Sequence, residues 1–345
     1  MDTITQIALG AAVGEAVLGR KVGNKAPLWG AVGGTIPDLD VLLTPFVSEM
    51  QGLAIHRGFS HSILFAILFA PLMGWCIHKI HQQAGAGWRE WSWLAFWSVF
   101  THPILDCFTV YGTQLFQPFS DYPVAWNAVF IIDPAYTLPL GLCVLAALFF
   151  HRNSEKRRWI NYAGLGISTA YLLLAVGLKL YALSYFEESL AAQKMPYNRI
   201  MSAAMPFNTF LWMGIAEDDE RQWVGLYSIF DGDRPVEFRE VPKNRDLIAD
   251  VMDQPPIQRL LWFSRGFYTV TEDAGDLYFN DMRFGRSDLW MDEIGRYIFS
   301  FRLIRDAANA KQISGFQRGD GARNFDGDAF GAMMNRMISR ISGVH

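Results

Sequence analysis

This chain of 345 residues has few cysteines, a small net charge and no serine-nucleophile motif. Each of these absences excludes a class of protein. All three cysteines precede residue 144 and lie in apolar segments, where cysteine behaves as a small hydrophobic residue. The net charge of −4 gives no reason to expect nucleic-acid binding. No G-x-S-x-G sequence occurs, which argues against a serine hydrolase elbow. The start, MDTITQ, has no basic region, so we expect no cleaved signal peptide.

Hydrophobic residues, in contrast, are plentiful and unevenly spread. They make up 51% of the chain, against 19% charged residues, and they concentrate before about residue 183. Four segments approach or exceed the ~18 apolar residues that cross a bilayer: 60–78, 91–109, 130–150 and 160–183. Two weaker segments, 3–19 and 27–47, contain polar or charged interruptions. We therefore predict a mainly α fold class, with a multi-pass transmembrane helical domain of five to six spans over residues 1–183.

The remaining residues, 184–345, contain no apolar run of that length. Residues 222–242 alternate in hydrophobicity around an Asp-Gly pair, which predicts a β-hairpin. Residues 266–285 and 295–304 give further candidate strands, and 329–341 a short helix. The sequence therefore predicts a β-rich or α+β extramembrane domain after the spans.

The basic residues of the first domain indicate an orientation. If all six segments cross, nine Lys and Arg fall on one side: Arg20, Lys21, Lys25, Lys79, Arg89, Arg152, Lys156, Arg157 and Arg158. The opposite loops carry only Arg57. Because Lys and Arg in short loops remain cytoplasmic, the N-terminus is expected to face outward. The C-terminal domain would then lie on the periplasmic, extracytoplasmic side of a bacterial inner membrane.

Unusual polar residues fall at the predicted outer ends of the spans. In TIPDLD, Asp38 and Asp40 would point the same way if the loop is extended, which suits metal binding, although a helix cap is the simpler alternative. In THPILD, His102 and Asp106 are four residues apart, so they share one face of a helix. A buried His–Asp hydrogen bond is the alternative there. Ionisable residues inside a span are costly and usually functional.

The segment HRGFSHS lies just before the span at 60–78. Ser60 could cap the following helix, which would put His61 in its first turn. Gly58 could let the backbone turn so that His56 approaches His61. Arg57, as the one basic residue on this side, could hold an anionic group through two hydrogen bonds. The segment therefore predicts two metal ligands and an anion-binding arginine.

Together these motifs predict a metal site at the outer membrane face. The six candidate ligands are Asp38, Asp40, His56, His61, His102 and Asp106. Mixed His and Asp ligation suits Zn²⁺, or else Mn²⁺ or Fe²⁺, and six ligands favour two ions ~3.5–4 Å apart. Asp133 could supply a further ligand or a general base. A Ser-His-Asp triad through Ser60 or Ser62 is the competing arrangement, but it leaves too many acids without a role.

At these residues the chain resembles the YdjM-like family of membrane-bound, metal-dependent hydrolases, some of them LexA-regulated. The similar pieces are MDTITQIALGAAVG, GTIPDLDVL, HRGFSHS and THPILDCFTVYGTQ, in family order over about the first 180 residues. Many relatives have a Thr-His pair where this chain has Thr5 and Gln6. A more distant similarity, of His102 and Asp106 to zinc-dependent phospholipase C, implies phosphoester substrates by analogy.

These observations lead to one hypothesis and two alternatives. We expect a membrane hydrolase that uses a metal-activated water on a phosphoester or lipid ester, with Arg57 stabilising the anion and membrane lipid as a partner. A metal transporter is the first alternative, but Glu15 is the main polar residue toward the cytoplasmic side. The second is a non-catalytic assembly protein in which the metal only holds helices together.

Overall fold

The computed structural model describes residues 1–345 except 289–294, 307–308, 310–311, 320–326 and 343–345. The chain divides into two compact units. The helical unit comprises Met1–Phe46, Ala54–Gly177 and Pro206–Asn208, and the sheet unit comprises Val47–Leu53, Leu178–Met205 and Thr209–His345. Each unit has its own core, so each is described separately below.

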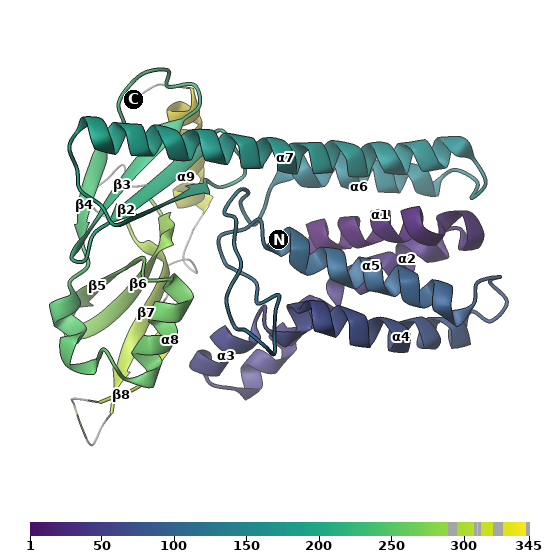
Figure 1. Ribbon diagram of the computed structural model, residues 1–345, viewed down its shortest axis with the longest axis horizontal. Coiled ribbons are helices and arrows are strands. Elements are labelled where there is room, and N and C mark those ends of the chain that lie inside the picture. The colour runs from purple at the N-terminus through teal and green to yellow at the C-terminus, as the bar shows by residue number, and fades with distance from the viewer. Residues whose placement is uncertain (289–294, 307–308, 310–311, 320–326, 343–345) are drawn as a thin grey trace. The chain divides into compact units, whose positions relative to one another are not determined.

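Helices run the length of the helical unit (Figure 1). They are α1 (Thr3–Val22), α2 (Lys25–Thr35), the 3₁₀ helices η1 (Pro37–Phe46) and η2 (Phe59–His61), α4 (Ile63–Ile80), α5 (Trp88–Asp106), α6 (Pro134–Leu148) and the first part of α7 (Glu155–Ala192). The short helix α3 (Glu49–Ile55) lies between η1 and η2 in the chain. Helix α1 packs against α2, α5 and α6, and α4 packs against α5. Helix α1 is therefore the centre of this unit.

Glycines bring α1 and α2 into direct backbone contact. A Cβ atom on Gly10 would lie 2.3 Å from the carbonyl oxygen of Gly30, and one on Gly34 would lie 2.5 Å from that of Gln6. Gly14 meets the carbonyl of Ala26 in the same way, at 2.4 Å. Small residues spaced four apart allow this approach, which any side chain would prevent.

Three helix hairpins turn at one end of this unit, which we call the basic end. Arg157, at the start of α7, donates to Asn24 Oδ1 (2.7 Å) between α1 and α2 and to the Phe150 carbonyl (3.0 Å) between α6 and α7. Lys21 pairs with Glu90 at 2.7 Å, which joins the end of α1 to the start of α5. The unit is thus held by hydrogen bonds and ion pairs at this end.

The prediction of five to six membrane spans is wrong. Within the described residues, two helices are long and apolar enough to cross a membrane, Ile63–Ile80 and Glu155–Ala192. Helix α6 is apolar but has 15 residues, about 22 Å of helix, which is shorter than a ~30 Å hydrocarbon layer.

The other predicted segments do not form membrane-spanning helices, for reasons that their hydropathy alone does not reveal. Segment 27–47 is broken after Thr35, where α2 stops and a 3₁₀ helix begins at Pro37. Helix α1 is largely buried inside the unit and carries Glu15 and Lys21, and α5 carries charged residues at both of its ends. Apolar residues in these helices thus pack against other helices of the unit.

The predicted β-rich C-terminal region is confirmed. The sheet unit contains β1 (Arg199–Ala204), β2 (Leu211–Glu217), β3 (Arg221–Ser228), β4 (Phe238–Pro242), β5 (Tyr268–Asp273), β6 (Asp276–Arg286), β7 (Tyr297–Arg305) and β8 (Ile313–Arg318). They form two antiparallel four-stranded sheets, in the orders β1-β2-β3-β4 and β5-β6-β7-β8. The predicted hairpin at 222–242 is β3 with β4, since Arg221 pairs with Pro242 and Gly225 with Phe238.

Helices complete the sheet unit. They are η3 (Arg245–Val251), α8 (Pro255–Ser264) and α9 (Gly327–Ile341), and α9 confirms the helix predicted at 329–341. The end of α7 covers the first sheet, where Phe186 packs beside Trp212 and Tyr227. Phe263 of α8 stacks on Phe284 of β6 in the second sheet. Both sheets thus bury an apolar face.

Replacing Gly30 with valine should lower the free energy of unfolding by about 1–3 kcal/mol, because the new side chain would separate α1 from α2. The matched control is Gly166→Val in α7, where an added Cβ would meet nothing within 4 Å. Thermal unfolding in detergent measures the stability of both purified variants. Equal stability of the two variants would contradict the backbone contact.

Candidate metal centre

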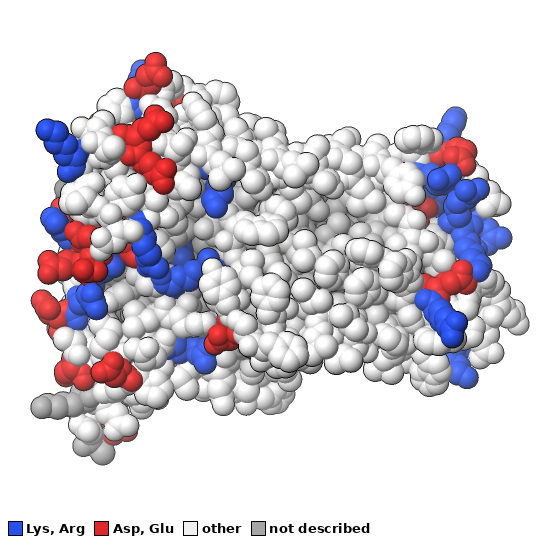
Figure 2. All heavy atoms as spheres, in the orientation of Figure 1, with Lys and Arg blue, Asp and Glu red and all other residues white. Residues whose placement is uncertain are grey.

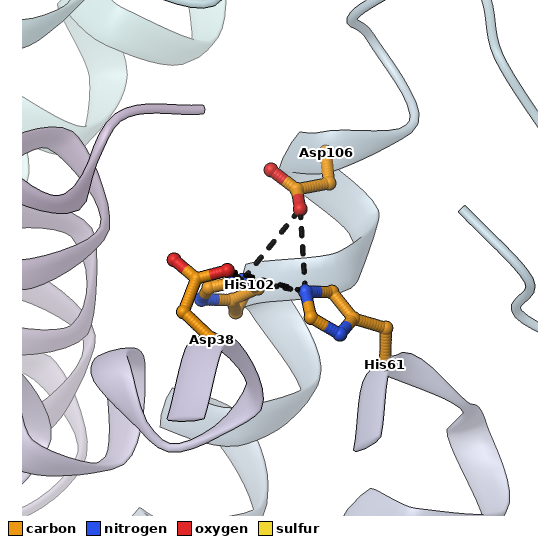
Figure 3. A group of neighbouring side chains, drawn as sticks. All are labelled: Asp38, His61, His102 and Asp106. Carbon is orange, nitrogen blue, oxygen red and sulfur yellow. Dashed lines mark hydrogen bonds and ion pairs between the residues drawn. The ribbon is translucent and has the colours of Figure 1, made fainter. Parts of the chain in front are cut away.

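Four side chains from three elements converge at the end of the helical unit opposite the basic end (Figure 3). Asp38 is the second residue of η1, directly after α2, and His61 is the last residue of η2. His102 and Asp106 lie one turn apart on α5, as their spacing predicted. Their ligand atoms all lie within 4.8 Å of one another, so they form one candidate metal-binding cluster.

The spacing of the ligand atoms can be compared with a metal ion's coordination shell. His61 Nε2 lies 3.2 Å from His102 Nε2, 3.4 Å from Asp38 Oδ1 and 3.5 Å from Asp106 Oδ2. His102 Nε2 lies 3.4 Å from Asp38 Oδ1 and 3.6 Å from Asp106 Oδ2. Zinc–ligand bonds of 2.0–2.2 Å give tetrahedral edges of about 3.3–3.6 Å. Five of the six distances among the four ligand atoms therefore match the edges of a tetrahedral site, and the sixth, from Asp38 to Asp106, is within 4.8 Å.

Hydrogen bonds on the far side of each imidazole orient Nε2 toward the cluster. His102 Nδ1 donates to the carbonyl oxygen of Gly34 at 2.6 Å. His61 Nδ1 lies 3.0 Å from Ser60 Oγ, whose hydroxyl donates to Asp40 Oδ2 at 3.1 Å. A proton on Nδ1 leaves the Nε2 lone pair free for a metal, and such partners fix the ring.

Burial and hydrogen bonding act in opposite directions on the protonation of the cluster. Burial lowers the pKa of His102, but hydrogen bonds with Asp106 and Asp38 outweigh it and raise that pKa to about 9, so a metal ion would have to displace a proton from this ring. Burial lowers the pKa of His61 to about 4, so its ring is neutral at pH 7 and can bind a metal. Burial raises the pKa of Asp38, but hydrogen bonds with His102 and His61 outweigh it and hold that pKa well below its usual range. Asp106 Oδ2 is buried without a hydrogen bond from the described residues. This oxygen forms an ion pair with Arg57, and it keeps lone pairs that a cation beside the two imidazoles could use.

Asp40 and His56, two of the six predicted ligands, lie beside the four-residue cluster and not in it. Asp40 Oδ1 lies 3.0 Å from His56 Nδ1, and Asp40 Oδ2 accepts from the backbone N–H of Arg57 at 2.9 Å. The expected extended loop is instead a 3₁₀ helix with three residues per turn. Side chains two residues apart therefore point in different directions. Asp40 lies on the Nδ1 side of the His61 ring, away from the cluster.

Arg57 is buried and its contacts are with protein groups. Its Nε lies 3.1 Å from Asp106 Oδ2, its Nη1 donates to Thr109 Oγ1 at 2.8 Å, and its guanidinium lies over the Tyr111 ring at 4.9 Å. Its backbone is left-handed, with φ of 57°. Arg57 therefore neutralises a cluster carboxylate in this structure, and its expected contact with an anionic substrate stays a prediction.

Sequence reasoning missed two supporting contacts. Gln6 Nε2 donates to Asp106 Oδ1 at 3.0 Å, and the Met1 amino group forms an ion pair with the same oxygen. The comparison with relatives marked Gln6 as an unusual residue. The contact between Gln6 and Asp106 could not be predicted, because it depends on how α1 packs against α5. The helix cap is also two residues later than predicted, because Ser62 rather than Ser60 accepts from the Phe65 N–H.

Asp133, the predicted general base, caps helix α6. Its side chain accepts from the backbone N–H groups of Ala135 (3.1 Å) and Tyr136 (3.4 Å), and from the Tyr171 hydroxyl (2.8 Å). Burial raises the pKa of Asp133, although these hydrogen bonds partly offset the effect. Asp133 is not among the four clustered ligands, and Asp121 is exposed.

A helical unit with two candidate membrane spans and a buried His/Asp cluster defines a membrane protein with a candidate metal site. Comparison with known proteins gives the family: residues 1–183, just over half of the chain, match the YdjM inner membrane protein family, and the chain belongs to it. It is also 31% identical over 141 residues to the uncharacterized protein YfhP of Bacillus subtilis (strain 168). That match covers 39% of this chain and 42% of YfhP. No solved structure matches.

Replacing Asp40 with asparagine should weaken Zn²⁺ binding by roughly 10–100-fold, because the Ser60–His61 hydrogen-bond chain loses its terminal carboxylate. Competition with a chromophoric chelator measures the affinity, and Asp121→Asn removes an exposed acid as the control. Unchanged affinity in Asp40→Asn would contradict the supporting role.

Proposed function

We propose that the protein is a metal-dependent hydrolase of the membrane, and that Asp38, His61, His102 and Asp106 hold one divalent metal ion. The observation that carries the proposal is the spacing of 3.2–3.6 Å in five of the six pairs among four ligand atoms, three of which belong to fully buried side chains. Two imidazole nitrogens and two carboxylate oxygens form a donor set that suits Zn²⁺ better than Ca²⁺ or Mg²⁺. The geometry favours one ion rather than two, because Asp40 and His56 bond to each other outside the cluster.

The chain's own residues would prepare the site for such a reaction. A bound ion of this kind polarises a phosphoryl or carbonyl oxygen and makes a water nucleophilic near neutral pH. His61 and His102 are held rigidly by Ser60 and the Gly34 carbonyl. Asp38 is the one cluster side chain that reaches the surface, with 26% exposure against 0% for the other three. We place substrate approach on the Asp38 side.

Exposed apolar side chains beside Asp38 support a phosphoester or lipid ester as the substrate. On η1 itself they are Leu39, Val41, Leu42, Leu43 and Phe46, and Phe46 is 84% exposed. The nearby loop after α5 adds Phe116 and Phe119. A large soluble substrate gains little from such a surface, whereas a lipid can bury acyl chains against it.

A metal that only holds helices together is the rival role. Four protein donors already complete a tetrahedron, and structural zinc sites have four protein ligands whereas catalytic sites keep a position open. The transport alternative is weaker, because Glu15, the main polar residue toward the basic end, is already paired with Arg157. Both of its carboxylate oxygens accept from Arg157, each at 2.6 Å.

The purified protein should contain about one zinc-type ion per chain, and the double variant His102→Ala/Asp106→Ala should lose it, because each lost side chain removes a ligand. Elemental analysis measures the metal, and His151→Ala removes an exposed histidine as the control. A metal-free wild-type protein after reconstitution would overturn the metal site.

A hydrolysis assay distinguishes an enzyme from a protein in which the metal only holds helices together. We expect the wild-type protein to cleave at least one substrate in a panel of phosphodiesters and phospholipid esters, and a chelator to abolish cleavage. Adding Zn²⁺ or Mn²⁺ after the chelator should restore cleavage. A protein that binds its metal stoichiometrically but cleaves nothing in the panel would favour the structural role.

We further propose that the basic end faces the cytoplasm, because nine Lys and Arg gather there and Arg57 alone stands at the other end. Single cysteines at Asn153 and Ser120, in a variant with Cys76, Cys107 and Cys143 replaced by serine, report the side. A membrane-impermeant maleimide should label Ser120→Cys, but not Asn153→Cys, in intact spheroplasts. The reverse pattern would invert the orientation.

A further inference from the structure

A second candidate site lies at the basic end. A cavity of about 250 Å³ opens among α1, the start of α5 and the start of α7. Its polar lining consists of Glu15, Arg20, Lys21, Glu90, Arg158 and Asn161. From Gln6, beside the metal centre, to Arg20 is 14 residues of α1, about 21 Å of helix. The cavity is therefore separate from the metal centre.

The cavity has an excess of positive charge. Both oxygens of Glu15 accept from Arg157, and both oxygens of Glu90 accept from Lys21 at 2.7 Å. Arg20 is exposed, and its guanidinium makes no hydrogen bond or ion pair with the described residues. Arg158 pairs with Glu155, three residues earlier, and that pair is partly exposed and weak. The Arg20 guanidinium is therefore available to an anion, and that of Arg158 becomes available when an anion replaces the weak pair with Glu155.

A buried polar atom in the cavity wall also needs a partner. Asn161 is 1% exposed, and its Nδ2 donates to the Ala12 carbonyl at 2.9 Å. Its Oδ1 is buried and accepts no hydrogen bond from the described residues. An acceptor beside two guanidinium groups suits a ligand that carries a hydroxyl together with its negative charge.

The residues around the cavity are typical of the depth of lipid headgroups. Helix α7 is a candidate membrane span, and Trp159 and Tyr162 near its start are 71% and 43% exposed. Aromatic residues of this kind concentrate where a membrane meets water. Figure 2 shows Lys and Arg gathered over this end of the helical unit, next to an uncharged surface along its helices. A phosphate at the membrane surface would therefore meet the mouth of the cavity.

We propose that this cavity binds the phosphate headgroup of an anionic phospholipid, with Arg20 and Arg158 as the residues that hold the phosphate. Guanidinium groups match phosphate oxygens through paired hydrogen bonds, and basic pockets between helices favour such headgroups. The site differs from the metal centre in place and chemistry, so it does not rest on the proposed hydrolase activity.

The test uses the full chain in a nonionic detergent, with micelles containing phosphatidylglycerol or phosphatidylcholine, or with inorganic phosphate. Thermal unfolding and native mass spectrometry report binding. Phosphatidylglycerol should raise the Tm and remain bound to the wild-type protein, while phosphatidylcholine and inorganic phosphate should do neither. The double variant Arg20→Gln/Arg158→Gln should bind phosphatidylglycerol at least tenfold more weakly.

The matched control is Lys79→Gln/Arg89→Gln, which removes two positive charges at the same end outside the cavity. It should retain the Tm rise. An equal loss in this control would overturn the proposal in favour of diffuse surface charge. A Tm rise with inorganic phosphate alone would overturn the lipid assignment. Because Arg20 is exposed and Arg158 is partly exposed, the Tm of each variant without lipid should equal that of the wild-type protein, and a lower value would assign Arg20 and Arg158 a structural role instead.

Discussion

The metal centre depends on the backbone contact between α1 and α2. Because Gly10, Gly30 and Gly34 have no side chains, the two helices approach until Gln6 and Gly34 are neighbours. Gly34 then presents its carbonyl oxygen to His102 Nδ1, and Gln6 reaches Asp106. The same packing fixes the point where α2 ends and η1 begins, which places Asp38 in the cluster. A glycine pattern thus determines where the four candidate metal ligands meet.

The two ends of the helical unit bury charge differently. At the basic end, Glu15 and Arg157 satisfy each other through two hydrogen bonds, so that buried pair is complete. At the metal centre, Asp106 is paired with Arg57 and the Met1 amino group, yet its Oδ2 lacks a hydrogen bond. Burying an incompletely satisfied carboxylate costs several kcal/mol. A cation among Asp106, Asp38 and the two imidazoles would offset this cost, which the Glu15 pair does not require.

The sequence could predict local spacing but not packing. Four-residue spacing placed His102 and Asp106 on one helix face, and the Asp-Gly pair placed the hairpin at 222–242. The separation of Asp38 from Asp40 could not be predicted, because it depends on a 3₁₀ helix where an extended loop was equally compatible with the residues. The span count failed for a related reason: apolar residues of α1 face other helices of the unit, and hydropathy does not distinguish them from residues that face lipid.

The exposure of Asp38 bears on whether the proposed metal ion would be catalytic or structural. His61, His102 and Asp106 are fully buried, and each is held by a further hydrogen bond or ion pair. Asp38 is partly exposed and lies on a 3₁₀ helix that also exposes the apolar side chains of Leu39, Val41, Leu42, Leu43 and Phe46. A metal that only pins helices together gains nothing from one ligand at the surface, since solvent there weakens the site. A hydrolase requires a substrate to reach the ion, and a carboxylate at the edge of the cluster provides that access beside a surface suited to acyl chains. The asymmetry of the four ligands is therefore an argument for the proposed catalytic role.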